Sequence, residues 1–434
     1  MEVPTSRGSI DAEIEAVFRR ESGRLISVLT RLFGPHNLEL AEDVVQASFV
    51  AALETWGKAG VPDNPAAWLL TTARHRAIDA IRREQTRRTF AADLTRYLDG
   101  EWTLTTTVRE AFGEDVIRDD QLRMIFMCCH PGLSAESQLT LILRTLCGLS
   151  VPATARALLT TEATVQKRMV RIRQRLKGVE FALPRPDERA KALEITHAAL
   201  YLLFNEGHLS TDEEPIRREL CGAAMALTQL IADEPSLHSS DTLGLLALMC
   251  FQAARMDSRL DANGEVVPLD RQDRTRWDRQ LISRGYACLV RASRMETVVA
   301  SRYHLEAAIA ARHCAARDFA ETDWVSICSL YDRLIELGPS PLAELNRAVA
   351  LSYRDGPEAA IPVVEAIRRS GRFEKSHAVA AVLANLYARA GKDEPSRRYL
   401  EEALASARTR HERQLIAQQV ERARDAYAGG SKTG

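Results

Sequence analysis

The chain has 434 residues and is almost neutral, with 58 Lys and Arg residues against 59 Asp and Glu residues. Its 46% hydrophobic and 27% charged content is ordinary for a globular protein, and no run of about 18 apolar residues predicts a membrane span. The first residues lack the basic and then apolar pattern of a signal peptide, so we expect a cytoplasmic protein of about two to four domains.

The first predicted block covers residues 10–86 and is helical. Residues 39–56, ELAEDVVQASFVAALETW, repeat apolar side chains with the spacing of one wide helix face. After a Gly- and Pro-containing loop, residues 64–84 predict a second helix that carries Trp68 among several arginines. An aromatic ring among arginines suits unstacked single-stranded DNA, because rings and guanidinium planes stack on bases. A tryptophan in such a helix is, however, more commonly a core residue.

Residues 87–117 are mixed and polar and predict a linker, and residues 118–180 form a second helical block. Within this block, apolar residues of 139–146 define one helix, which Gly148 ends. A short helix follows at 151–159, and Thr160 and Thr161 offer an N-cap for a third. The third helix carries an apolar stripe and ends in TVQKRMVRIRQRLK, residues 164–177. A short helix, a tight turn and a basic amphipathic helix together predict a helix-turn-helix.

The helix-turn-helix predicts binding to duplex DNA. Its early residues can reach base edges in the major groove, and its arginines can hold phosphates. The candidates are Glu162, Thr164, Gln166, Lys167, Arg168, Arg171, Arg173 and Arg175. The alternative is a solvated basic face on an ordinary helix, which the order and lengths of the three helices disfavour.

The two blocks together resemble an extracytoplasmic-function sigma factor of bacterial RNA polymerase. AEDVVQASF, then PAAWLLTTARHRAIDAIRR, then a linker and a helix-turn-helix match the order of region two and region four of that family. The resemblance implies that the partners are core RNA polymerase and promoter DNA, which region two opens at the minus-ten element and region four reads at the minus-thirty-five element.

The resemblance also implies which residues of region two carry these contacts. Polymerase binding falls to Asp43, Gln46 and Phe49, and the family's usual acidic residue after the glutamine is Ala47 here. Contacts with the minus-ten element fall to Asn64, Trp68, Arg74, His75, Arg76, Arg82 and Arg83.

Residues 188–427 predict helix after helix, in pairs near the 34-residue tetratricopeptide period. The clearest pair is 382–407, and 342–367, 303–337 and 195–227 are weaker relatives. We therefore expect an all-α chain with two small N-terminal helical domains and a C-terminal α-solenoid-like domain. This resembles the subgroup of these sigma factors that carries a tetratricopeptide-like extension.

The extension contains the segments NEGH, RTRWD and YHLEAAIAARH, which resemble signatures of that subgroup. Asn205, Glu206, His208, Trp277 and Asp278 are candidates to line a ligand site or a protein contact. Helix ends and packing between repeats explain the same residues at least as well.

The sequence offers no catalytic motif: it lacks a phosphate-binding P-loop, H-E-x-x-H, G-x-S-x-G and a Rossmann glycine series. Its eight cysteines form no C-x-x-C, which predicts buried thiols and no metal site. We therefore expect neither an enzyme nor a cofactor. Two other hypotheses remain open from the sequence: a helix-turn-helix regulator with a tetratricopeptide sensor that binds DNA without polymerase, and a repeat scaffold with no role at promoters.

Overall fold

A computed structural model describes residues 7–85, 110–158, 160–208, 217–261, 264–295, 300–371, 377–407 and 410–430. The regular structure in these ranges is helical, apart from a single antiparallel bridge between Leu260 and Val266. The predicted all-α class is confirmed. Positions 87–109 of the predicted linker lie outside the described residues.

The chain divides into two compact units, Met1–Glu206 with Gly222–Leu237, and Gly207–Cys221 with His238–Gly434. The helices up to the boundary are α1 (Arg7–Phe33), α2 (Leu38–Ala59), α3 (Pro65–Gln85), α6 (Glu114–Cys128), α7 (Ala135–Leu141), the π-turn η2 (Ile142–Leu146), α8 (Val151–Ala157), α9 (Glu162–Arg175), α10 (Arg189–His208) and α11 (Arg218–Ala232), with a 3-10 turn η1 at Pro35–Asn37. Both predicted blocks therefore consist of helices at the expected places.

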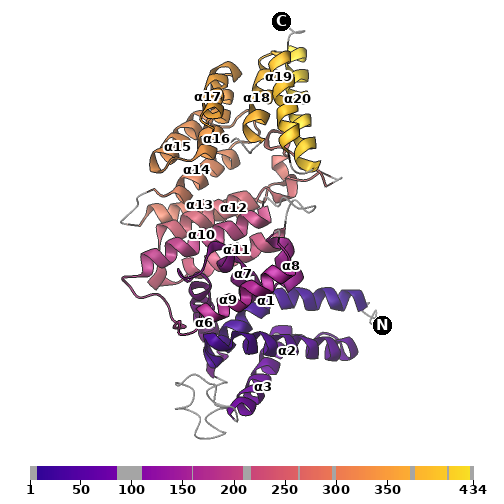
Figure 1. Ribbon diagram of the computed structural model, residues 1–434, viewed down its shortest axis with the longest axis vertical. Helices are drawn as coiled ribbons and strands as arrows, with labels where there is room; N and C mark the ends of the chain where they lie inside the picture. The colour runs from indigo at the N-terminus through magenta and orange to yellow at the C-terminus, as the bar shows by residue number, and fades with distance from the viewer. Residues whose placement is uncertain are drawn as a thin grey trace. The chain divides into compact units, whose positions relative to one another are not determined.

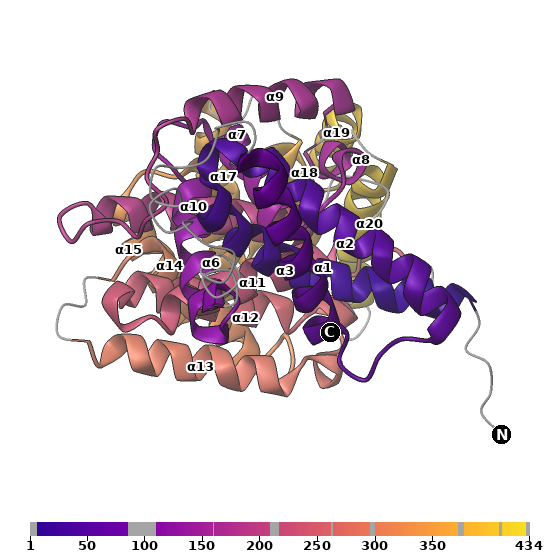
Figure 2. The same ribbon diagram turned by 90° about the horizontal axis from the view of Figure 1, so that it is seen from below.

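In the first unit, α1, α2 and α3 pack on one another, as Figure 2 shows. Apolar residues such as Leu25, Leu29 and Trp56 are almost fully buried in this bundle. Burial of each such side chain contributes about 1.5–3 kcal/mol, which offsets the entropy lost on folding.

The first and second predicted blocks also pack on each other, because α1 contacts both α6 and η2. An ion pair of 2.7 Å joins Arg31 of α1 to Asp120 of α6, whose side chain is fully buried. Gly23 of α1 lies so close to η2 that an added Cβ would overlap the carbonyl oxygen of Leu146. The two blocks thus form a closed contact in which glycine is needed at position 23.

The second unit contains nine further long helices among the residues that the structure describes. They are α12 (Ser240–Ala253), α13 (Arg279–Ser293), α14 (Arg302–Ala315), α15 (Trp324–Leu337), α16 (Pro341–Arg354), α17 (Pro357–Arg369), α18 (Ala378–Arg389), α19 (Asp393–Ser406) and α20 (Arg410–Gly430). Short 3-10 turns lie at η4 (Met256–Ser258), η5 (Leu269–Arg271) and η6 (Arg274–Arg276), and another, η3 (Pro235–Leu237), ends the first unit.

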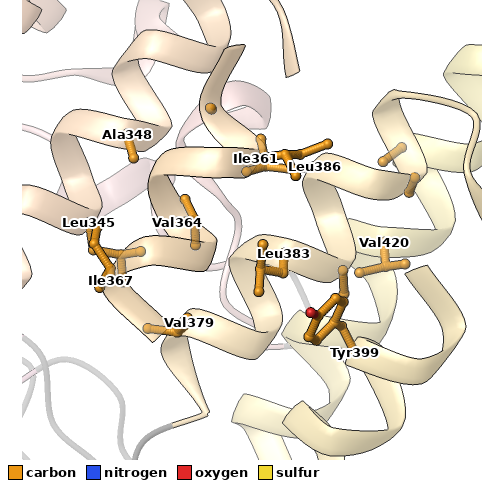
Figure 3. Close-up of a cluster of buried hydrophobic side chains, with 14 residues drawn as sticks. Leu345, Ala348, Ile361, Val364, Ile367, Val379, Leu383, Leu386, Tyr399 and Val420 are labelled. Atoms are coloured by element: carbon orange, nitrogen blue, oxygen red, sulfur yellow. The ribbon is translucent and has the colours of Figure 1, made fainter. Parts of the chain in front are cut away.

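From α14 onward each helix packs on the next, and α18, α19 and α20 lie side by side in Figure 1. Each of the five helices α16–α20 gives an apolar side chain to one core cluster: Leu345, Val364, Leu383, Tyr399 and Val420 (Figure 3). The helix pairs predicted at 342–367 and 382–407 correspond to α16 with α17 and to α18 with α19. A C-terminal region of packed consecutive helices is confirmed.

All eight cysteines are buried and unpaired, as the apolar pattern around them predicted. Burial raises the pKa of the Cys147 thiol to about 12, so the reactive thiolate is scarce at neutral pH. These side chains therefore act as small hydrophobic residues in the core.

Candidate nucleic-acid interface

The helix-turn-helix forms as the sequence predicted. Thr161 caps α9, since its hydroxyl accepts a hydrogen bond of 3.2 Å from the backbone N–H of Thr164. The apolar stripe Val165, Met169, Ile172 and Leu176 is buried. This leaves the opposite face of α9 to solvent.

Five of the eight candidates on α9 are exposed: Glu162, Gln166, Lys167 and Arg171 toward its start, and Arg175 at its end. Thr164 is half-buried, and its hydroxyl lies 2.8 Å from that of Thr161. The exposed side chains combine one acceptor, one amide and two cations at the first two and a half turns. That chemistry fits base edges and phosphates in a major groove.

The other three arginines of α9 have partners within the protein. Arg168 donates to the hydroxyl of Thr140 at 3.1 Å, and Arg175 donates to the carbonyl of Gly132 at 2.9 Å. Both contacts fasten α9 to the segment that precedes it in the helix-turn-helix. Arg168, a candidate for DNA contacts, is half-buried in this structure.

Arg173 links α9 to α2 of the first block. Its guanidinium lies 3.0 Å from a carboxylate oxygen of Glu42 and 3.3 Å from one of Glu39. Glu42 is only 5% exposed, and burial raises the pKa of its carboxyl although Arg144 and Arg173 lower it. Arg173 is therefore occupied by carboxylates in this structure, which the sequence pattern did not indicate.

The start of α3 holds two of the candidates for contacts with unpaired bases. The side chain of Asn64 accepts from the backbone N–H of Ala67 at 3.0 Å, which caps the helix. Trp68 is half-buried and meets the buried Trp56 edge to face, with ring centroids 5.4 Å apart. Trp68 is thus packed in part against the core and in part accessible to solvent.

The basic residues of α3 differ in exposure. His75 and Arg82 are exposed, and Arg74 and Arg76 are half-buried. Arg82 lies 4.0 Å from Asp79, one turn earlier. Arg83 lies in α3, but its side chain is outside the described residues.

The candidates on α2 separate into exposed and buried residues. Asp43 and Gln46 are exposed, whereas Phe49 is 4% exposed and meets Phe18 edge to face at 4.5 Å. Val50 and Leu53 are 52% and 47% exposed and follow Asp43 and Gln46 at helical spacing. We call Asp43, Gln46, Val50 and Leu53 the α2 face. Its two apolar members were missed as site residues, since Leu53 reads in sequence as part of the core stripe.

The C-terminal candidates serve partly as helix ends. Asp278 caps α13 by accepting from the backbone N–H groups of Gln280 and Leu281 at 2.8 and 3.0 Å. His208 and Trp277 are buried in the second unit. Asn205 and Glu206 are half-buried near the end of α10 and belong to the first unit.

Three family models match parts of the chain. Residues 17–87 match sigma-70 region 2, and residues 123–176 match sigma-70 region 4. The chain is a sigma factor of the sigma-70 family. Residues 192–293 match a family of unknown function, DUF6596.

An uncharacterized protein of Rhizobium meliloti (strain 1021) is 37% identical over 380 residues, which cover 85% of this sigma factor and 86% of that protein. The similarity thus extends over most of both chains. No solved structure matches this chain significantly.

As a sigma factor, the protein directs promoter recognition by RNA polymerase, and catalysis belongs to the polymerase. Region 2 followed by region 4 gives an architecture like that of extracytoplasmic-function sigma factors. None of the described helices has the length and hydropathy needed to span a membrane.

Proposed function

We propose that this sigma factor belongs to the extracytoplasmic-function subgroup with a tetratricopeptide-like extension, and that it acts in the cytoplasm. Region 4 contacts the duplex minus-thirty-five element through the exposed side of α9. Region 2 contacts unpaired bases of the minus-ten element through Asn64, Trp68 and the basic residues of α3. The observation that carries this assignment is the pair of exposed basic surfaces on α9 and α3, one suited to duplex and one to single-stranded DNA.

We further propose that unit 1 is closed and must open before it occupies a promoter. The two elements are separated by about 25 base pairs, or about 85 Å at 3.4 Å per pair. Arg173 of α9 nevertheless lies 3.0 Å from Glu42 of α2. A helix held against region 2 cannot reach a site this far from the minus-ten element, so opening releases Arg173 for a phosphate.

The α2 face is the proposed docking surface for polymerase. Its exposed apolar residues, Val50 and Leu53, are flanked by Asp43 and Gln46, as an amphipathic helix needs for binding another helix. Phe49 lies buried beneath this face and supports it from the core.

Replacing Leu53 with glutamate is expected to weaken binding of core polymerase at least about tenfold. The substitution loses about 1–3 kcal/mol of apolar burial and places a charge in the contact. Titration of labelled sigma factor with core polymerase measures the change. Val325 is 65% exposed on α15, so Val325→Glu is the matched control and should bind normally. Equal affinity of both variants would remove the α2 face from the docking surface.

The extension is proposed to regulate the sigma regions or to add contacts to polymerase, through a protein partner or a ligand on the helical repeats. The support is its size: the second unit includes residues 238–434 and has its own buried core. A unit of this size is unnecessary for promoter contacts that region 2 and region 4 provide.

Ending the chain after Leu237 keeps all segments of the first unit and tests this role. We expect transcription from the cognate promoter to change at least about fivefold, which corresponds to the low end of allosteric coupling. Run-off transcription with purified core polymerase measures the effect, at equal amounts of folded protein. Unchanged transcription and unchanged polymerase affinity would show that the extension does neither.

A further inference from the structure

Three arginines lie close together in the second unit: Arg255, just after α12, Arg259, just after η4, and Arg274, in η6. The guanidinium carbons of Arg255 and Arg274 lie 5.8 and 5.0 Å from the centroid of the Trp277 ring. Trp277 is 2% exposed, so both cations are held against a buried indole. We call Arg255, Arg259, Arg274 and Trp277 the arginine cluster.

Two members of the cluster have clear structural partners. Arg274 donates to the backbone carbonyls of His313 and Ala316 at 2.7 and 3.1 Å. Arg259 donates to the carbonyl of His208 and lies 2.9 Å from its ring nitrogen Nδ1. These contacts fix the two arginines, but carbonyls and neutral rings do not neutralise a guanidinium charge.

Arg255 has no such partner among the described residues. Its Nε is buried without a hydrogen bond, and within the described ranges no carboxylate lies within ion-pair distance of its guanidinium. The buried Nε1 of Trp277 and Nδ1 of His313 likewise have no hydrogen-bond partner in the described structure. Three nitrogen atoms that can donate are therefore left without acceptors in one region.

The charge of the cluster is consistent with a missing anion. Burial, Arg259 and Arg274 lower the pKa of Arg255 to about 10. Burial and the two arginines Arg255 and Arg274 lower the pKa of His313 to about 3, so this ring stays neutral. An uncompensated buried charge costs several kcal/mol, and an anion with several acceptor oxygens removes that cost.

We propose that the arginine cluster binds the oxyanion group, phosphate or carboxylate, of a small ligand of the C-terminal unit. Arg255 is half-buried and is the member of the cluster whose guanidinium forms neither an ion pair nor a hydrogen bond within the described ranges. Its planar fork matches either oxyanion through two parallel hydrogen bonds. Trp277 and His313 then donate the remaining hydrogen bonds. The site unites the segments NEGH, RTRWD and YHLEAAIAARH through His208, Trp277 and His313, for which promoter recognition gives no role.

The test uses the full chain with inorganic phosphate and, separately, acetate, each compared with sodium chloride at equal ionic strength. At saturating anion we expect the thermal midpoint of the second unit to rise by about 2–4 °C. The arm with the larger shift identifies which oxyanion the site prefers. No shift beyond that of sodium chloride in either arm would overturn the proposal.

Arg255→Met is the decisive variant, because methionine fills similar space without a charge. We expect its affinity for the preferred anion, measured by calorimetry, to fall at least about tenfold. Without anion its thermal midpoint should equal or exceed that of the native chain, since repulsion among the arginines is relieved. A lower midpoint or an unfolded protein would assign Arg255 a structural role and overturn the proposal.

Two further variants control the measurement. Arg255→Lys keeps the charge without the planar fork and should bind with intermediate affinity. Arg333 is exposed on α15, so Arg333→Met removes one positive charge elsewhere in the same unit and should bind as the native chain does. Equal weakening by Arg333→Met would mean that net charge, not the cluster, attracts the anion.

Discussion

Replacing Gln166, Lys167 and Arg171 together with alanine is expected to reduce transcription from the cognate promoter by at least about a hundredfold. The three side chains are exposed on α9, and no other described residue of the protein binds them. Each base or phosphate contact contributes about 1–3 kcal/mol, so loss of two contacts already gives this factor. The fold should be unaffected, because the buried stripe and the Thr161 cap remain.

Run-off transcription with core polymerase measures this effect, and a promoter without its minus-thirty-five element provides the comparison. The native chain should lose activity on that promoter, whereas the triple variant should show little further loss. A charge-matched control replaces Arg185 and Lys191, which are exposed outside α9, with alanine. If the control loses as much activity as the triple variant, general charge and not the recognition helix explains the result.

The helices of both sigma regions could be predicted from sequence because their signals are local. The spacing of Val165, Met169, Ile172 and Leu176 alone predicts which side of α9 is buried. Gly148 marks the end of the segment formed by α7 and η2, and Thr161 marks the start of α9. Such signals need no knowledge of the partner against which the helix packs. The same is true of the helix pairs α16 with α17 and α18 with α19.

The site residues could be predicted less completely, because exposure depends on contacts between distant segments. Phe49 is a docking candidate in sequence, and its burial with Phe18 beside it could not be predicted from the helix pattern. Arg173 looks like a phosphate contact, yet it pairs with Glu42, 131 positions away. Arg255 and Trp277 are separated by 22 positions and His208 and Arg259 by 51. No periodicity of a single helix indicates such groupings.

The closed contact between the sigma regions leads to the second large effect: Gly23→Ala should open the first unit. The added Cβ overlaps the backbone carbonyl of Leu146, which cannot rotate away as a side chain would. Overpacking of this kind costs about 1–3 kcal/mol. Because α1 and η2 belong to different sigma regions, separation of the regions relieves the overlap without disturbing either bundle.

We expect Gly23→Ala to bind a duplex minus-thirty-five fragment about tenfold more tightly than the native chain does in the absence of polymerase. The reason is that destabilising the closed state by about 1.4 kcal/mol raises the ratio of open to closed molecules about tenfold. Fluorescence anisotropy measures this affinity. Glu42→Gln should act in the same direction, because it weakens the ion pair that holds Arg173 at 3.0 Å. Two substitutions at unrelated contacts, one steric and one ionic, would then both increase the affinity for DNA by opening the first unit.

Gly57→Ala is the matched control for this experiment. Gly57 also lies in a helix of region 2, α2, but an added Cβ there meets nothing within 4 Å. Alanine should stabilise that helix by up to about 1 kcal/mol and leave DNA affinity unchanged. If Gly23→Ala instead binds DNA like the native chain while its scattering profile shows separated regions, then closure does not restrain α9. Opening and DNA binding are coupled only if both measurements change together, because the same contact then restrains both.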